Sequence, residues 1–174
     1  MDAKGKGIME IVTYPDSVLK KKAEAVANID ESVQDLIHNM SELMYQASGI
    51  GLAANQVGVA KKVITFDLDY KEKGQNLKVL INPTIILAEE KIEFEEGCLS
   101  IPDFQAKTTR KKYLKVKAVD RNGKPVDIEA EDLLAICIQH EIDHLNGILI
   151  LDHVSHLKRD IYQRRVEKLL RQAK

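Results

Sequence analysis

The chain has 174 residues, of which 44% are hydrophobic and 30% charged, and its formal net charge is -1. This length fits one ordinary domain, and the near-neutral charge gives no overall reason to expect DNA as a partner. Its two cysteines are too few for a disulfide framework. We see no secretory signal and no apolar run of membrane-span length, so we expect a cytoplasmic protein with no membrane association.

The first predicted helix is amphipathic and begins after Asp30, a residue type suited to an N-cap. Its apolar residues recur at helical spacing until Gly49 ends the pattern. These residues are Val33, Leu36, Ile37, Met40, Leu43 and Met44. The segment SGIGLAANQVGV over 48–59 follows and lacks the Lys-Ser/Thr of a phosphate loop. Its local pattern favours a tight turn into a strand over a ligand-binding loop.

The middle of the chain predicts short strands. Apolar or alternating runs place them over 63–68, 77–82, 92–95, 113–119 and 125–128. We expect Pro83 to close the second of them, and Asn122-Gly123 to form a two-residue hairpin turn between the last two. Together these segments predict antiparallel sheet.

The run over 131–146 is apolar on nearly every side and ends at Gly147, so it predicts a buried helix. It contains QHEIDH, residues 139–144. The fold class is therefore α+β, with antiparallel β-sheets packed around a buried central helix that carries HExxH, an N-terminal helix and a C-terminal helix.

The predicted C-terminal helix over 157–174 is basic, since seven Lys/Arg stand against Asp160 and Glu167 and give a local charge of +5. Its pattern fits a solvated helix and a polyanion-binding one equally well. We expect an apolar stripe to dock on the body while four basic residues stay largely exposed. The stripe is Tyr162, Val166, Leu169 and Leu170, and the basic residues are Arg164, Arg165, Lys168 and Arg171.

The HExxH residues carry the clearest chemistry in the sequence. On a helix, His140 and His144 lie one turn apart on one face, with Glu141 beside the first. Burying two histidines and a glutamate on so apolar a helix is costly unless a metal or another partner satisfies them. The pattern therefore predicts a metal site, which normally needs a third protein ligand.

Several residues are candidates for that third ligand. The extended metzincin pattern fails because Ile150 occupies its last histidine position. Glu167 lies in the basic helix, and His153 and His156 follow the end of the buried helix, so all three are weak candidates. Cys98 remains, at the end of an alternating segment, and a thiolate is a strong ligand for a transition metal.

Three separated motifs of the chain resemble those of the peptide deformylase family, in that family's order. They are GIGLAANQ over 49–56, EGCLS over 96–100 and QHEIDH over 139–144. The resemblance covers nearly the whole chain from about Ile8 onward. Three motifs together are far more specific than HExxH alone. The resemblance implies a single catalytic domain over 1–174, with a short N-terminal extension over 1–7.

The resemblance implies that Cys98, His140 and His144 hold one divalent metal ion. Members of the family use Fe2+ and accept Zn2+, Ni2+ or Co2+ in its place, and this ligand set suits all of them. The implied reaction is hydrolysis of the N-formyl group from the formylmethionine of new polypeptides, which releases formate. A metal-bound water or hydroxide would be the nucleophile.

The resemblance also implies roles for the surrounding residues. Glu141 would act as general base and acid, and the side-chain amide of Gln56 and the backbone N–H of Leu99 would stabilise the oxyanion. Substrate-binding residues would be Gly51, Ile50, Gly97 and Cys137, with Cys137 a wall of the pocket. The residue types themselves suggest Asp143 as a partner of a ligand imidazole and Glu96 paired with a basic residue such as Arg110, and a purely structural role fits both equally well.

The implied partners are N-formylmethionyl nascent peptides and, through the basic C-terminal helix, the ribosome. One departure concerns Gln105 and Ala106, which stand where many bacterial members carry a basic residue. Two other functions stay open on sequence alone. One is another HExxH amidase or peptidase, and the other is a ribosome-binding protein whose metal has no catalytic role.

Overall fold

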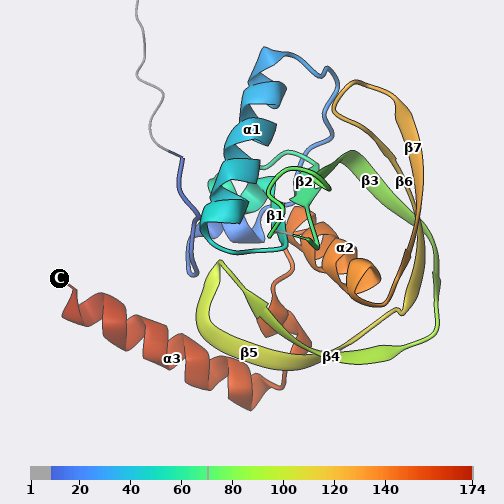
Figure 1. The fold of residues 1–174 in the computed structure, drawn as a ribbon. Coiled ribbons are helices and arrows are strands. Elements are labelled where there is room, and N and C mark those ends of the chain that lie inside the picture. The colour runs from blue at the N-terminus through green and yellow to red at the C-terminus, as the bar shows by residue number, and fades with distance from the viewer. Residues whose placement is uncertain (1–8, 70, 174) are drawn as a thin grey trace, which may run out of the picture.

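The computed structural model describes residues 9–69 and 71–173, so the predicted extension over 1–7 lies outside the described residues (Figure 1). The fold is α+β, as predicted, and its helices are α1 (Glu31–Gln46), α2 (Asp132–Leu145) and α3 (His156–Gln172). Short 3-10 helices are η1 (Ser17–Lys20), η2 (Ala54–Val57) and η3 (Ile150–His153). Within the described ranges, no helix combines the length and apolar character needed to span a bilayer.

The strands form two antiparallel sheets. The larger has the order β1-β2-β3-β6-β7, and the smaller is the pair β4-β5. The larger sheet consists of β1 (Gly51–Ala53), β2 (Val63–Phe66), β3 (Lys78–Glu89), β6 (Tyr113–Val119) and β7 (Pro125–Glu131). The smaller consists of β4 (Ile92–Cys98) and β5 (Ile101–Arg110).

Helix α1 begins where the sequence predicted. The Asp30 carboxylate accepts a hydrogen bond from the Val33 N–H at 3.1 Å and so caps the helix. The apolar face of α1 packs on one side of the larger sheet, with Met40 and Met44 fully buried. Successive strand residues point to opposite faces of the larger sheet. Val63 packs with the residues of α1, and the next residue, Ile64, packs in the cluster that contains α2.

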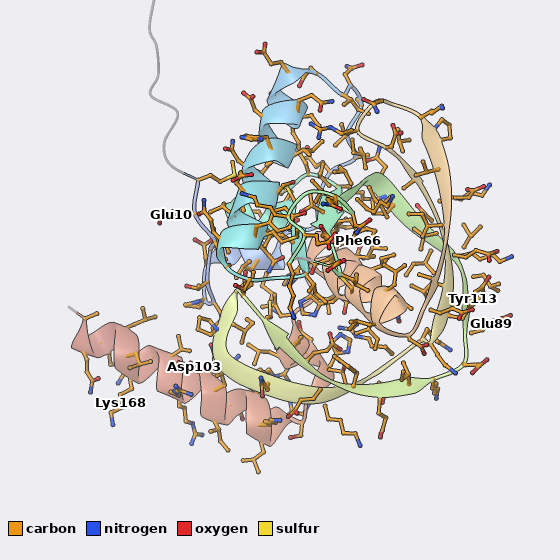
Figure 2. The ribbon with its side chains drawn as sticks, in the orientation of Figure 1. Glu10, Phe66, Glu89, Asp103, Tyr113 and Lys168 are labelled. Carbon is orange, nitrogen blue, oxygen red and sulfur yellow. The ribbon has the colours of Figure 1, made fainter. Side chains whose placement is uncertain are left out.

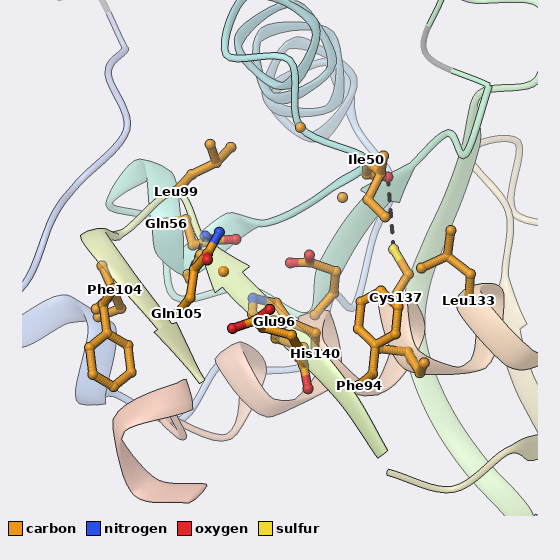
Figure 3. A pocket seen from close by; sticks show the side chains of 18 of the residues that line it. Ile50, Gln56, Phe94, Glu96, Leu99, Phe104, Gln105, Leu133, Cys137 and His140 are labelled. Carbon is orange, nitrogen blue, oxygen red and sulfur yellow. Dashed lines mark hydrogen bonds and ion pairs between the residues drawn. The ribbon is translucent and has the colours of Figure 1, made fainter. Parts of the chain in front are cut away.

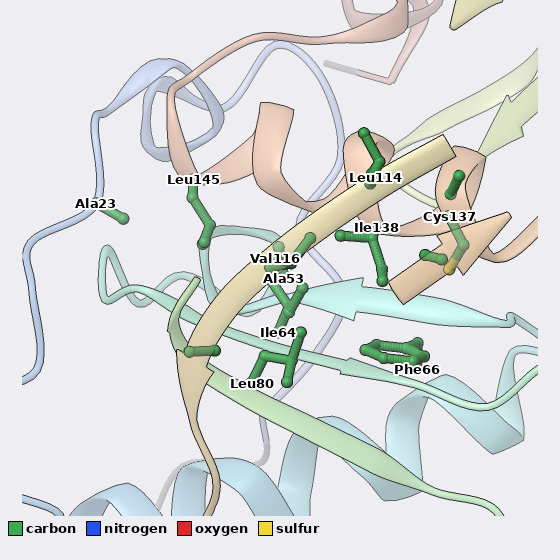
Figure 4. Packing of buried hydrophobic residues seen from close by; sticks show 13 residues of the cluster. Ala23, Ala53, Ile64, Phe66, Leu80, Leu114, Val116, Cys137, Ile138 and Leu145 are labelled. Atoms are coloured by element: carbon green, nitrogen blue, oxygen red, sulfur yellow. The ribbon is translucent and has the colours of Figure 1, made fainter. Parts of the chain in front are cut away.

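Helix α2 is buried on the other side of that sheet (Figure 4). Ala135 and Ile138 contribute to a core cluster with Ile64, Phe66 and Leu114 of the strands. The helix ends at Leu145, and Gly147 follows with a left-handed φ of 71°. The predicted buried helix is confirmed, and its burial fixes the direction in which the HExxH side chains point.

Two strand predictions were wrong. Strand β3 does not stop at Pro83, because the β3–β6 register is irregular between Ile81 and Thr84, and a proline is tolerated at such a bulge. The β6–β7 turn is longer than two residues. The Asp120 N–H donates to the Lys124 carbonyl at 2.8 Å, which places Arg121, Asn122 and Gly123 in the loop.

Strand β5 was not predicted from the sequence. Its buried positions hold small or polar residues, such as Ala106, Thr108 and Arg110, so apolar alternation is weak. The strand is stabilised by its pairing with β4 and by the residues around Arg110. Because these contacts join distant parts of the chain, local pattern does not reveal them.

Helix α3 lies against β5 and extends away from the body (Figures 1 and 2). Tyr162 is buried and Val166 is half-buried, but Leu169 and Leu170 are 54% and 48% exposed. The predicted docking stripe was therefore wrong in its C-terminal half, which runs past the edge of the body. The four basic residues named above are exposed, as predicted.

Candidate metal centre

Helix α2 and the end of β4 bring three metal-ligating atoms together. The Nε2 atoms of His140 and His144 are 3.2 Å apart, and the Cys98 Sγ is 3.3 Å from the His144 Nε2. All three atoms lie within 4.8 Å of one another. Donors bonded to one tetrahedral ion at about 2.0–2.3 Å lie roughly 3.3–3.8 Å apart, so this cluster fits a single ion.

A buried network fixes the ring of His140. Its Nδ1 is 2.8 Å from the Glu96 Oε1, which leaves Nε2 facing Cys98 and His144. Arg110 binds both oxygens of Glu96, at 2.8 and 3.0 Å, and the Thr108 hydroxyl also donates to this carboxylate. Burial raises the pKa of Glu96, but the hydrogen bonds from His140 and Arg110 outweigh it and lower the pKa to about 2. Glu96 is thus an anion that orients a ligand.

The expected contact between Glu96 and Arg110 is present, but the expected role of Asp143 was wrong. Glu96, and not Asp143, is the carboxylate that contacts a ligand imidazole. Asp143 instead accepts from Arg110 at 2.5 Å and lies 2.8 Å from the Nε2 of the exposed His153. The side chain of Asp143 therefore points toward Arg110 of β5.

Glu141 is the second acidic group of the centre, and it differs sharply from Glu96. It is only 4% exposed, and its Oε2 has no hydrogen-bond partner among residues 9–69 and 71–173. Burial is the main reason that its pKa is raised to about 7. A carboxyl group with such a pKa, facing a pocket, is suited to accepting and returning a proton near neutral pH.

Gln56 is held with its amide nitrogen toward the centre. Its Oε1 accepts a hydrogen bond from the Ala53 N–H at 2.9 Å, which fixes the orientation of the amide. Its Nε2 then lies 3.6 Å from the Cys98 Sγ and donates to the Ser100 hydroxyl at 3.2 Å. The glycine-rich segment is therefore part of the site, contrary to what its local pattern favoured.

Cys98, His140, Glu141 and Gln56 line a pocket of about 900 Å³, and the third metal-ligating residue, His144, is buried behind it (Figure 3). Predicted residues on its wall are Ile50, Gly51, Gln56, Glu96, Gly97, Cys98, Leu99, Gln105, Cys137, His140 and Glu141. Burial raises the pKa of the Cys137 thiol well above its usual value, so this residue is a neutral part of the wall. Sequence reasoning missed further apolar lining residues, which include Phe94, Phe104, Leu133 and Ile136. Their apolar character was visible, but nothing local distinguished them from core residues.

The geometry defines the class of protein. A Cys/His/His donor set lies at a pocket that also holds the buried Glu141 carboxyl group, whose Oε2 has no hydrogen-bond partner among the described residues. This combination of a metal site and a proton-accepting group is typical of a metal-dependent hydrolase.

Comparisons with known proteins then identify the family. A family model described as polypeptide deformylase matches residues 8–160. A peptide deformylase from Thermodesulfovibrio yellowstonii is 54% identical over 158 residues, which cover 91% of this chain and 96% of the relative. The peptide deformylase 1 of Pseudomonas syringae pv. tomato is 48% identical over 162 residues, covering 92% and 95%. This chain belongs to the peptide deformylase family and catalyses that family's hydrolysis of N-formyl groups.

Solved structures agree with this identification. A crystal structure of a peptide deformylase from Legionella pneumophila superposes with a TM-score of 0.88 at 43% identity, covering 95% of this chain and 97% of that one. The peptide deformylase from Ehrlichia chaffeensis in complex with actinonin gives a TM-score of 0.86 at 38% identity, covering 92% and 96%. The match therefore extends over nearly the whole fold.

Proposed function

We propose that Glu141 is the general base and acid of formyl hydrolysis, and its buried, unpartnered Oε2 is the observation that carries this assignment. Cys98, His140 and His144 would hold the metal ion, which supplies the Lewis acidity that activates a water and polarises the formyl carbonyl. Glu141 takes a proton from the attacking water and passes it to the departing amine.

The amide of Gln56 and the backbone N–H of Leu99 stabilise the negative charge that develops on the formyl oxygen. The orientation of Gln56 supports this role, since the Ala53 N–H holds its oxygen and leaves its nitrogen to donate. Such a donor costs no reorganisation at the moment of reaction, because it is already in place.

The apolar side of the pocket receives the methionine side chain. Ile50 and Cys137 lie together there, with the Cys137 thiol 3.8 Å from the Ile50 carbonyl, and Phe94 and Leu133 complete the wall (Figure 3). Gly51 and Gly97 leave their backbone accessible to the peptide. An unbranched thioether side chain adapts well to a pocket of this kind.

The physiological metal is Fe2+ in this proposal, by resemblance to the family, and Zn2+, Ni2+ or Co2+ would substitute. The donor set is compatible with all four ions. Anaerobic purification followed by metal analysis tests this assignment. Zinc as the sole ion in cells grown with ample iron would contradict it.

The substrates in the cell are formylated nascent chains, and we place the enzyme in the cytoplasm at the ribosome, with the whole chain acting as one catalytic domain. The exposed basic residues of α3 support an electrostatic contact with ribosomal RNA. Co-sedimentation with ribosomes at increasing salt tests this. If variants with neutral residues in place of the exposed basic residues of α3 bound ribosomes as strongly as the wild type, this proposal would be contradicted.

The decisive experiment compares formate release from formyl-Met-Ala-Ser by the metal-loaded wild type and by Glu141→Gln. We expect the variant to keep its metal and to lose roughly 10²–10⁴-fold in kcat, which is the usual contribution of general acid-base catalysis. Unchanged turnover in a metal-loaded Glu141→Gln variant would exclude the proposed role. Cleavage of the Met-Ala bond without formate release would instead favour a peptidase.

A further inference from the structure

One wall of the pocket is a bulge rather than regular sheet. The β4–β5 register pairs Cys98 with Ile101 and then Gly97 with Gln105, so the three residues between Ile101 and Gln105 have no Cα partner in β4. One of them, Asp103, has a left-handed φ of 55°, which is unfavourable for a residue with a side chain. Ladder pairing does not hold this segment, and other contacts must fix its position.

Helix α3 supplies those contacts through Tyr162. This tyrosine is only 5% exposed, and its hydroxyl donates to the Pro102 carbonyl at 3.0 Å. Its ring packs edge-on against Phe104, with the ring centroids 5.0 Å apart. One side chain of α3 therefore contacts the bulge at both of its ends.

A second group of contacts comes from basic residues of α3. Arg165 pairs with the Asp103 carboxylate at 3.2 Å and also donates to the Asp103 carbonyl at 3.4 Å. Lys158 lies over the Phe104 ring, with its Nζ 5.4 Å from the centroid. Figure 2 shows Asp103 beside α3. All three bulge residues are thus held by α3.

The bulge belongs to the pocket that contains the metal centre. Asp103 and Phe104 line that pocket together with the adjacent Gln105. Figure 3 shows Phe104 and Gln105 on the side of His140 opposite to Ile50 and Cys137. If the formyl group lies at the metal and the methionine side chain fills the apolar side, the remaining wall is available to the chain that follows methionine.

We propose that α3 positions this outer wall through Tyr162 and Arg165, and that the wall holds the substrate residues after methionine. The proposal rests on the function proposed above. Tyr162 and Arg165 are positioning residues, since they contact Pro102, Asp103 and Phe104 and not the metal-ligating atoms.

The test compares two substrates, formyl-Met-Ala-Ser and formyl-methionine amide, which lacks the following residues. The variants are Tyr162→Phe and Arg165→Ala, with Arg165→Lys as the conservative variant and the exposed Arg164→Ala as the matched control. Thermal melting and metal content are measured for each, to separate positioning from unfolding. Asp103→Asn removes the carboxylate partner of Arg165, so it tests the same ion pair by a change in the pocket wall instead of in α3.

We expect Tyr162→Phe and Arg165→Ala to raise KM for the tripeptide by roughly two- to fivefold, which is the effect of losing one hydrogen bond or exposed ion pair. Their kcat should not change, because the lost contacts act equally on bound substrate and transition state. KM for formyl-methionine amide should not change, Arg165→Lys should recover part of the loss, and Arg164→Ala should match the wild type.

An unchanged KM for the tripeptide in both variants would overturn the proposal. An equal rise for both substrates would also overturn it, since α3 would then act on the centre in general. A wild type that releases formate from neither substrate would instead contradict the proposed function, so the two failures are distinguishable.

Discussion

At the scale of single residues, Gly51 shows how tightly the centre is built. A Cβ at this position would lie 2.5 Å from the Glu141 Oε1 and 2.9 Å from the Cys137 Sγ. Both distances are too short for real contacts, so the Glu141 carboxylate and the Cys137 thiol would have to shift. Only glycine leaves the carboxylate where it can face the pocket.

Gly51→Ala should therefore displace Glu141 and lower kcat at least roughly tenfold, since small misplacements of a catalytic group are costly. The three atoms nearest to the new methyl group belong to Glu141 and Cys137, and none belongs to Cys98, His140 or His144. We expect metal content to stay at the wild-type level, measured by elemental analysis beside formate release. Full activity in Gly51→Ala would show that Glu141 needs no fixed position.

The ion pair of Arg110 with Glu96 differs from the surface pairs in its burial. Both side chains are only 4% exposed, whereas Lys115 and Glu129, which also pair across two strands, are 43% and 66% exposed. Removing one partner of a buried pair leaves an uncompensated charge, while an exposed pair is screened by water.

We expect Arg110→Met to destabilise the fold by about 3–5 kcal/mol and Lys115→Met by about 1 kcal/mol or less. Urea unfolding of the two variants, which lose the same charge and keep an aliphatic side chain, measures the difference. Equal urea midpoints for the two variants would show that the buried pair and the exposed pair contribute equally to stability. Arg110→Met should also weaken metal binding, because Glu96 would orient His140 less firmly.

At the scale of elements, the segment after α2 depends on a close backbone contact. Gly147 has a φ of 71°, and a Cβ there would collide with the Lys20 carbonyl oxygen and lie 2.7 Å from its carbon. Gly123 has a similar φ of 82°, but its nearest neighbour would be the Ile29 side chain at an ordinary 3.9 Å. The two glycines share a backbone conformation and differ in crowding.

Gly123→Ala should cost about 1–2 kcal/mol, which is the price of a left-handed conformation for a residue with a side chain. Gly147→Ala should cost roughly 3 kcal/mol or more, because overpacking against rigid backbone adds to that strain. Thermal or urea unfolding gives both values. Equal losses in the two variants would mean that the η1 segment moves away easily.

Element predictions succeeded where the local pattern reports burial directly. The apolar spacing of α1, its Asp30 cap and the apolar run of α2 each indicated the correct helix. The predictions failed where the formation or the end of a strand depends on residues that are distant in the sequence. Strand β5 is held by its pairing with β4 and by the contacts of its Arg110 with Glu96 and Asp143, and β3 continues past Pro83 because β6 accommodates a bulge there.

At the scale of the whole molecule, the metal site links α2 of the central core to the smaller β4–β5 sheet. An ion bound by Cys98, His140 and His144 therefore joins two parts of the fold. Because such an ion binds the folded chain far better than the unfolded one, its binding free energy adds to stability.

Removing the metal with a chelator should lower the melting temperature. At a free-metal concentration 100 times Kd, the expected loss in unfolding free energy is about 2.7 kcal/mol. Cys98→Ser, which weakens the donor set, should respond much less to the chelator. Differential scanning calorimetry of both proteins measures the effect, and an identical shift in the two would show that the stabilising ion lies elsewhere.

The sequence by itself determined the features that depend on spacing along the chain. Two histidines four residues apart share a helix face, and Glu141 stands next to the first, wherever the helix lies. The motif set added Cys98 as the third ligand, and the structure places its sulfur 3.3 Å from the His144 Nε2.

Only the tertiary structure decided which groups surround that centre. Glu96 rather than Asp143 orients His140, Phe94 and Leu133 join the pocket, and the first half of α3 docks while its end stays exposed. The physical reason is that these contacts join residues far apart in the sequence. Their energies depend on distances and burial that exist only after the sheets and helices have packed together.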